Sequence, residues 1–315
     1  MFKNALLFRI GSDWQAPPVM ALQDALEGDA FAPCTPTQEL STGWIPPRGE
    51  EGSGLVESIG GQLIMKLFIE KKSVPGSAIK HELEERCKRI EAERGRAPGR
   101  KEKKELKEEI RFELLPRAFS KRSQCIVWID TKNQLLVIGT GSKSVADLVI
   151  TQLVDTLAGA SSVIALKPLN TAMSPSAAMA MWLQTMEAPY NFSIDRDCEL
   201  KQMDNEQSVV RYARHNLEIA EIAEHIKSGK VPTKLAMTWN NKVSFVLTDK
   251  FQVSKLEFID VLLGEGEEGG FDTDAAIATG GLTEMLPDLI DALGGELEDG
   301  AANGEAQEET EAAAA

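Results

Sequence analysis

Residues 114–122 place basic side chains on both sides of one aromatic residue. Arg117 precedes Phe119, and Lys121 and Arg122 follow it. Guanidinium and ammonium groups donate hydrogen bonds to phosphate and carboxylate oxygens. The pattern therefore predicts a surface that contacts an anionic partner, with burial of Phe119 as a plug in the core as the alternative.

A second basic group surrounds a Gly/Pro-rich break in a helical pattern, at residues 95–99. Its members are Arg94, Arg96, Arg100, Lys101, Lys103 and Lys104. They would concentrate positive charge at one end of a helical hairpin. Contact with phosphate and simple solvation are both open for this group.

A third basic group lies in the second half of the chain. Arg211 and Arg214 fall on the tip of a predicted β-hairpin, and Lys227, Lys230 and Lys234 surround the end of a helix and the start of the next strand. Lys227 has an ordinary explanation in the helix dipole. Arg211 and Arg214 have no such explanation, which favours a basic hairpin with a binding role.

Charge is divided unevenly along the chain. The formal net charge is −15, yet Lys255 is the last basic residue and residues 257–315 carry 17 acidic groups, so residues 1–256 sum to +2. A near-neutral body with basic blocks and a separate acidic tail is compatible with nucleic-acid binding, although the total charge argues against it. A tail that folds back over the basic surface is a further hypothesis.

Other chemistry-bearing residues show no catalytic or metal-binding spacing. Residues 139–144 lack the glycine directly before the lysine that a phosphate-binding loop requires, and Ser142 and Ser144 are predicted to cap a helix instead. The cysteines form no C-x-x-C pair, and the histidines have no metal-site spacing. A nuclease would need clustered carboxylates, for which Asp195 and Asp197 are the nearest approach. We therefore expect no enzyme activity, no cofactor and no metal.

Hydrophobic periodicity predicts the elements that position these groups. Alternation over residues 60–71 predicts a strand covered on both faces. Residues 75–115 carry one apolar stripe on a charged rod, which predicts two helices separated by the break. The remaining predicted strands are 2–10, 125–129, 134–138, 163–169, 192–200, 209–212, 231–239 and 243–248, and the remaining predicted helices are 16–27, 144–157, 177–183, 217–227 and 282–293.

The predicted fold class is α+β, with mixed sheets and a projecting charged helical hairpin. We expect a central α+β sheet region from residues 1–74 with 116–170, the hairpin over 75–115, and a second α+β region with a β-hairpin finger over 171–260. An acidic Gly/Ala-rich segment, 261–315, follows and is expected to be disordered from about residue 296. No signal peptide or membrane span is predicted, and we expect a cytoplasmic protein.

Several blocks together resemble the RdgC family of bacterial recombination-associated proteins. The matching stretches are Phe31-Ala-Pro-Cys34, Gly43-Trp-Ile-Pro-Pro47, Leu114-Leu-Pro-Arg-Ala-Phe-Ser120, Ser123-Gln124 with Trp128-Ile-Asp130, and Gly229-Lys-Val-Pro-Thr-Lys-Leu-Ala236 with Trp239. They occur in the expected order. The acidic, Ala-rich end after about residue 296 departs from the family pattern.

The resemblance implies a homodimer closed into a ring that encircles double-stranded DNA without sequence preference and restrains RecA-mediated strand exchange. It implies that Phe119 closes the ring and that the hairpin with Arg211 and Arg214 is a finger that reaches toward DNA. Tyr212 and Ala213 stand where a denser basic run is expected. Single-stranded DNA is a further candidate partner, RecA is a functional partner, and the nucleoid is the implied location.

A protein-interaction scaffold is the alternative function. In that interpretation the charged helices bind another protein and contact with DNA is incidental. Salt separates the two functions, because binding through phosphates weakens steeply as ionic strength rises, whereas an apolar protein interface changes little.

Overall fold

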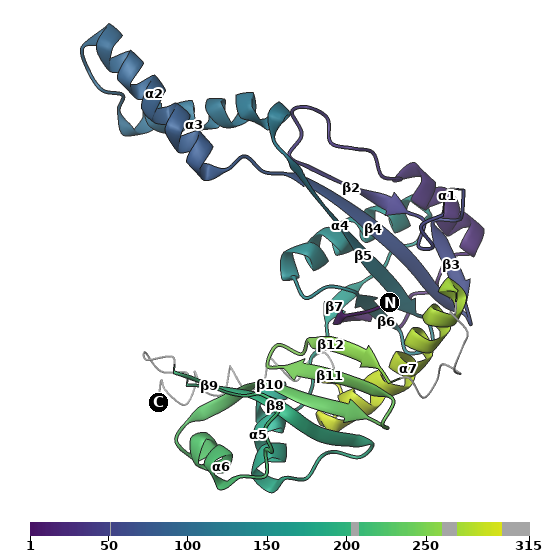
Figure 1. The fold of residues 1–315 in the computed structure, drawn as a ribbon. Helices are drawn as coiled ribbons and strands as arrows, with labels where there is room; N and C mark the ends of the chain where they lie inside the picture. The colour runs from purple at the N-terminus through teal and green to yellow at the C-terminus, as the bar shows by residue number, and fades with distance from the viewer. Residues whose placement is uncertain (51, 203–207, 260–269, 298–315) are drawn as a thin grey trace, which may run out of the picture.

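The computed structural model describes residues 1–50, 52–202, 208–259 and 270–297. Its strands form a 12-stranded sheet in the order β2-β4-β5-β6-β1-β12-β11-β10-β8-β9, with β3 paired to β4 and β7 paired to β1. The sheet curves into an arc, with a helical arm at one end and β9 at the other (Figure 1). The fold is therefore α+β with a large antiparallel sheet.

The elements have the following bounds. The strands are β1 (Asn4–Ile10), β2 (Leu40–Ile45), β3 (Val56–Ile59), β4 (Gln62–Lys72), β5 (Ser120–Asp130), β6 (Leu135–Ile138), β7 (Leu166–Pro168), β8 (Phe192–Gln202), β9 (Val209–Tyr212), β10 (Lys230–Trp239), β11 (Val243–Thr248) and β12 (Val253–Phe258). The helices are α1 (Val19–Gly28), α2 (Gly76–Arg94), α3 (Arg100–Leu114), the 3₁₀ turn η1 (Leu115–Arg117), α4 (Lys143–Gly159), α5 (Pro175–Thr185), α6 (Ala220–Lys227) and α7 (Phe271–Ala292).

Strand β4 is buried on both faces, as its alternation predicts. Leu63, Met65 and Leu67 pack into one core with residues of α1 and α4. Ile64 packs with Trp128 into a second core that includes α7. Apolar side chains on both sides of one strand thus hold two helical layers against the same sheet.

Strand β1 joins the two halves of the sheet. Asn4 and Ala5 pair with Ser254 and Val253 of β12, whereas Leu6 to Arg9 pair with β6. Only a short stretch of backbone pairing therefore connects the halves, and the remaining connection must come from packed side chains.

Helix α7 supplies much of that packing and is longer than the sequence predicts. It begins at Phe271 rather than at residue 282, and it contains Gly280, Gly281 and Pro287. Glycine is a poor helix former, which is why the sequence pattern placed the start of the helix after Gly280 and Gly281. Its buried residues are Ala275, Ala278, Thr279, Leu282, Met285, Leu286, Leu289 and Ile290.

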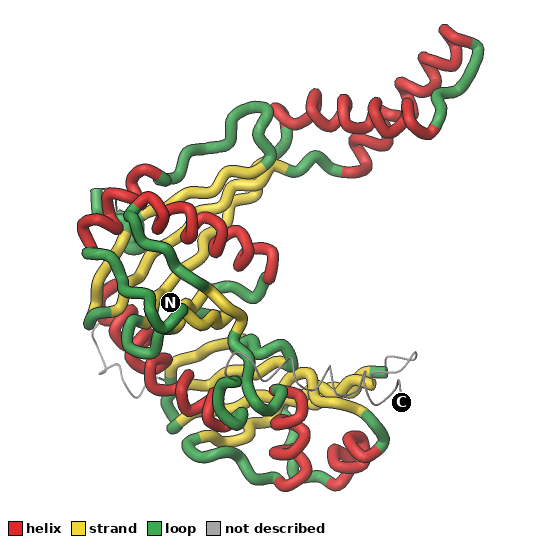
Figure 2. Tube along the Cα trace, turned by 180° about the vertical axis from the view of Figure 1, so that it is seen from behind, coloured by secondary structure: helices red, strands yellow, loops and turns green. Residues whose placement is uncertain are grey.

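Helices α2 and α3 lie against each other and project from the end of the sheet (Figures 1 and 2). Gly95 ends α2 in the left-handed conformation, with φ of 67°. Arg86 joins the two helices, because it contacts Glu82 on α2 at 3.2 Å and also pairs with Glu113 on α3. Arg111 pairs with Glu39 at 2.7 Å and so fixes the base of α3 to the loop before β2.

Several local expectations need correction. Residues 40–45, 56–59 and 253–258 form β2, β3 and β12, none of which the sequence pattern predicts. In β2, Gly43 lets the backbone of Phe31 come close, since a Cβ at Gly43 would lie 2.4 Å from Phe31 Cα. Ser142 occupies the N-cap of α4 but makes no side-chain capping bond, because its hydroxyl lies 3.0 Å from that of Ser144.

Candidate nucleic-acid interface

The turn between α3 and β5 presents the first basic group to solvent. Leu115 is buried and anchors the turn, while Phe119 is 94% exposed. Arg117 and Lys121 are also exposed, and neither has an ion-pair partner among the residues that the structure describes. The alternative in which Phe119 fills the core is therefore wrong for this chain.

Arg122 belongs to the same segment but has a different environment. Its Nε donates to Glu70 Oε1 at 2.9 Å across the β4–β5 pair, and the Glu70 side chain is only 3% exposed. Glu70 also accepts from the backbone N–H of Cys34 at 2.7 Å. The hydrogen bond from Cys34, followed by that from Arg122, lowers the pKa of Glu70. Arg122 thus serves the fold as the counterion of a covered carboxylate.

The arm tip holds the second basic group, and Glu102 neutralises part of it. Arg94 and Arg96 lie 3.4 Å and 3.1 Å from Glu102. Glu102 also accepts from the backbone N–H of Gly99 at 2.9 Å, in a capping-box arrangement at the start of α3. The hydrogen bond from Gly99 and then that from Arg96 lower its pKa. Within the described chain, Arg100 and Lys101 have no acidic partner.

The third basic group does not lie at a hairpin tip. Arg211 is on β9, opposite Glu199 of β8, and Arg214 follows β9 with φ of 54°. Residues 203–207, which connect β8 to β9 in the sequence, lie outside the described residues. The prediction that Arg211 and Arg214 lie at the tip is therefore wrong. The chain enters β9 at Val209, so Arg211 and Arg214 come later and lie toward the open end of the hairpin.

The structure brings some predicted residues together and leaves others apart. Arg211 and Lys234 share Glu199, at 2.7 Å and 3.2 Å. Lys230 lies 3.4 Å from His225 Nδ1, and Lys227 is in the last turn of α6. The arm and the β8–β9 hairpin extend toward the same side of the arc, from its opposite ends (Figure 1).

Sequence reasoning missed the acids that partner these cations. Glu70, Glu102 and Glu199 each contact one or more predicted binding residues. A local signal existed only for Glu102, which stands three residues after the N-cap of its helix. Glu70 and Glu199 meet their arginines through strand pairing, which the sequence alone does not specify.

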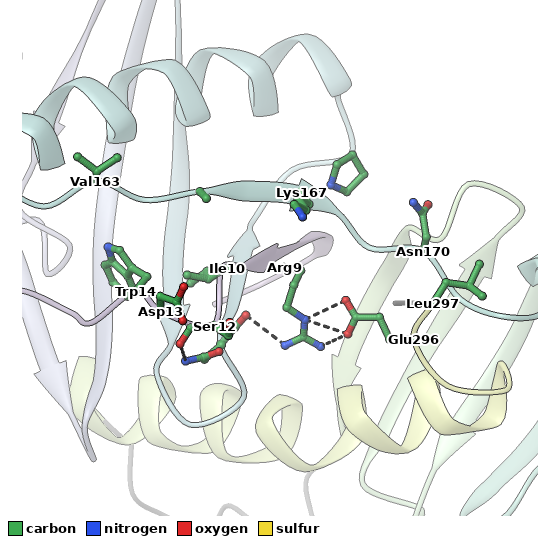
Figure 3. A pocket seen from close by; sticks show the side chains of 14 residues that line it. Arg9, Ile10, Ser12, Asp13, Trp14, Val163, Lys167, Asn170, Glu296 and Leu297 are labelled. Atoms are coloured by element: carbon green, nitrogen blue, oxygen red, sulfur yellow. Dashed lines mark hydrogen bonds and ion pairs between the residues drawn. The ribbon is translucent and has the colours of Figure 1, made fainter. Parts of the chain in front are cut away.

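A pocket of about 910 Å³ lies at the edge of β1, beside β7 (Figure 3). Arg9 and Glu296 point toward each other across it, with Arg9 Nε 2.9 Å from Glu296 Oε2. Arg9 also donates to the backbone carbonyl of Gln134 at 3.2 Å. The guanidinium is therefore already occupied by protein groups.

Groups able to hold a metal do not gather within the described residues, where no cluster of three or more His, Cys, Asp or Glu side chains is found. Asp195 accepts from Thr238 at 2.8 Å, and Asp197 accepts from the backbone N–H of Arg214 at 2.8 Å. Burial raises the pKa of Cys125 and of Cys198 to about 12. Both thiols are therefore protonated and unreactive at neutral pH.

No helix in the described part of the chain combines the length and apolar character that crossing a membrane requires. Fold and surface together define a class of protein: a curved, antiparallel α+β protein whose candidate site is a set of exposed cations rather than a pocket of reactive groups.

Comparison with known sequences gives this class a family. The family model described as "Putative exonuclease, RdgC" matches residues 1–296. Proteins named recombination-associated protein RdgC are 42% identical in Dechloromonas aromatica, 40% in a Janthinobacterium strain and 38% in Bordetella pertussis. Each match covers 94% of this chain and 98%, 99% and 98% of the respective relative. The chain belongs to the RdgC family.

Proposed function

We propose that the protein binds double-stranded DNA without sequence preference, encircles it as a ring-shaped homodimer and restrains RecA-mediated strand exchange. Single-stranded DNA is a secondary ligand in this proposal, and the protein acts at the nucleoid. The names of the relatives support a role in recombination. The observation that carries DNA binding is the exposed turn at Arg117, Phe119 and Lys121, in which neither cation has an acidic partner within the described residues.

Phosphate contact explains this turn better than solvation does. A buried Leu115 holds the turn in place, so the exposed cations and the aromatic ring are presented by a fixed backbone. Contacts of this kind position a protein on the DNA backbone and read no base sequence. Phe119 is available for the contact between protomers, because its ring is almost fully exposed.

A protein-interaction scaffold is the second candidate, and one observation favours it. Phe112 on α3 is 59% exposed, although the rest of the arm surface is strongly charged. An exposed aromatic side chain on a projecting helix is suited to a protein contact. The exonuclease description of the family has no counterpart in clustered acidic ligands within the described residues, and the proposal contains no nuclease step.

Salt-dependent binding of a labelled linear duplex tests the proposal. We expect tight binding at about 50 mM salt and a loss of several orders of magnitude at about 200 mM, because each neutralised phosphate releases counterions. The Arg117→Ala/Lys121→Ala variant should lower the slope of log K against log salt by about 1.8, the value for two phosphate contacts. Blocking both duplex ends should slow association if the ring threads onto DNA.

The matched control is Lys80→Ala/Lys88→Ala, which removes the same charge from the arm. Both lysines are on α2 and already contact acids, Glu84 at 3.9 Å and Glu85 at 3.6 Å. The control should leave the salt slope unchanged. No binding of the wild type at low salt would contradict DNA binding and leave the scaffold as the better candidate.

A further inference from the structure

One carboxylate on β8 is contacted from both neighbouring strands. Glu199 pairs with Arg211 on β9 and with Lys234 on β10. Arg211 Nε lies 2.7 Å and Lys234 Nζ 3.2 Å from Glu199 Oε2. Thr233 donates its hydroxyl to Oε1 of the same carboxylate at 2.9 Å. Two cations and a hydroxyl therefore converge on one anion.

A β-bulge in β10 makes this convergence possible. Pairing passes from Pro232 opposite Leu200 to Lys234 opposite Glu199, so Thr233 is an extra residue. Successive side chains of a regular strand point to opposite faces, and a regular strand could not direct both Thr233 and Lys234 to one carboxylate. The backbone is thus built to collect donors around Glu199.

The acid is covered while the cations are open to solvent. The Glu199 side chain is 16% exposed, against 72% for Arg211 and 50% for Lys234. Arg211 uses Nε for Glu199, and among the described residues no acid accepts a hydrogen bond from its terminal amino groups. A phosphate that approached from solvent could therefore bind these amino groups and Lys234 Nζ, which are donors suited to it.

Glu199 remains charged at neutral pH. Burial acts to raise its pKa, but hydrogen bonds from Thr233, Arg211 and Lys234 outweigh burial and lower it. The arrangement consequently carries one net positive charge rather than two, although both cations are on the surface.

We propose that Arg211 and Lys234 form a phosphodiester-binding site and that Glu199, held in place by the hydroxyl of Thr233, is its built-in counterion, which positions the cations and limits their affinity for phosphate. This inference rests on the proposed DNA-binding function. Glu199 lowers the affinity of the two cations for phosphate, and it also holds them in a fixed geometry. The result is a weak contact with phosphate. Such a contact suits a protein that moves along DNA, because phosphate contacts do not depend on sequence and are equivalent from one position to the next.

Substitution of Glu199 by glutamine, which keeps its shape, tests the inference. Glu199→Gln should add about one phosphate contact, so it should bind labelled duplex more tightly than wild type at about 50 mM salt. Its advantage should shrink about threefold to fourfold between about 50 and 200 mM salt, which is the dependence of one contact. Asp195→Asn is the matched control, because Asp195 lies on the same strand and contacts Thr238 rather than a cation.

A second comparison separates local release of the cations from a general change of charge. In an Arg211→Gln/Lys234→Gln background, Glu199→Gln should give no such gain, since the groups that it releases are gone. If Glu199 had only a structural role, Glu199→Gln would lower the melting temperature without raising the affinity for duplex. Should Glu199→Gln fail to fold, the single Arg211→Gln and Lys234→Gln variants decide, because each should abolish the contribution of the whole site.

The outcomes separate the two proposals. Wild-type protein that does not bind duplex at low salt overturns the proposed function and this inference with it. Wild-type binding with no gain in Glu199→Gln, or a gain equal to that of Asp195→Asn, overturns the role of Glu199 alone.

Discussion

Arg117 and Arg122 are close in one exposed segment, yet their surroundings give them different roles. Arg122 is bound through its Nε to a covered carboxylate, whereas Arg117 has no acidic partner within the described chain. A phosphate must compete with Glu70 for Arg122 but not for Arg117. Arg117 should therefore contribute more to DNA binding than its neighbour, in spite of the equal formal charge.

Glu70→Gln should destabilise the fold in a pH-dependent manner. The pKa of Glu70 is lower in the folded protein than its ordinary value of 4.5. Its stabilising contribution is therefore fully present above pH of about 4.5 and is lost as pH falls through the lower folded value. Thermal melts should show the variant several degrees below wild type at neutral pH, with the difference shrinking under acidic conditions.

The exposed acid Glu187 provides the control for this measurement. Glu187→Gln should melt with the wild type at every pH, because no described cation contacts that side chain. A Glu70→Gln difference that stayed constant down to acidic pH would contradict the role of the ionised carboxylate.

The segment from Arg117 to Arg122 contains one feature that the sequence predicts and one that it does not. The sequence predicted a basic turn at residues 117–122 that contacts a partner, with burial of Phe119 as an open alternative that the structure excludes. The neutralisation of Arg122 by Glu70 depends on a strand register that joins residues 52 positions apart. A shift of one residue would place Glu70 on the other face of the sheet, so no local pattern could reveal this ion pair.

At the scale of elements, two adjacent glycines in α7 have different surroundings. A Cβ at Gly280 would meet no atom within 4 Å, whereas a Cβ at Gly281 would lie 3.3 Å from Phe258 Cε1 and 3.5 Å from Val243 Cγ2. Gly280 therefore costs helix stability without a packing role. Gly281 allows the helix to approach β11 and β12.

Gly280→Ala should stabilise the protein by about 0.5–1 kcal/mol, which is the helix-interior difference between glycine and alanine. Gly281→Ala gains the same propensity, but the crowded Cβ should cancel that gain or reverse it. Urea unfolding of both variants measures the difference. Equal stabilisation by the two substitutions would contradict the close packing of α7 on β11 and β12.

These glycines also explain why α7 was only partly predicted. Residues 282–293 have the apolar periodicity of a buried helix, but residues 271–281 are rich in small and acidic residues that favour no particular element. Tertiary packing of Ala275 and Ala278 decides the conformation there. By contrast, β4 and the pair α2 and α3 follow from strong local patterns, and their existence was predicted correctly.

At the scale of the whole molecule, α7 holds the curved sheet together. The two halves share only a short stretch of pairing through β1, and α7 adds contacts on both sides of that joint. Arg48 fixes its start, contacting Asp272 of α7 at 2.5 Å and Glu57 of β3 at 2.8 Å. Asn133 donates to the backbone carbonyl of Thr283 at 2.9 Å in the middle of the helix.

Two truncations test this dependence. A chain that ends at residue 297 retains every described element and should melt at the wild-type temperature. A chain that ends at residue 270 loses α7 and its buried side chains, so it should not give a cooperative transition. A cooperative melt of the shorter chain would show that the sheet is stable without its helix. The DNA affinity of the chain that ends at residue 297, compared with that of the full chain, also tests whether the acidic tail covers the basic surface.

The contact between Arg9 and Glu296 joins positions 287 residues apart. During translation, Arg9 leaves the ribosome long before its partner has been made. The halves of the sheet meet at β1, whereas α7, which packs across them, is made long after β1. Until then the apolar faces that α7 covers are open to other chains, as expected for a domain dominated by such distant contacts. The nascent protein should consequently depend on chaperones most strongly in the interval before α7 has left the ribosome.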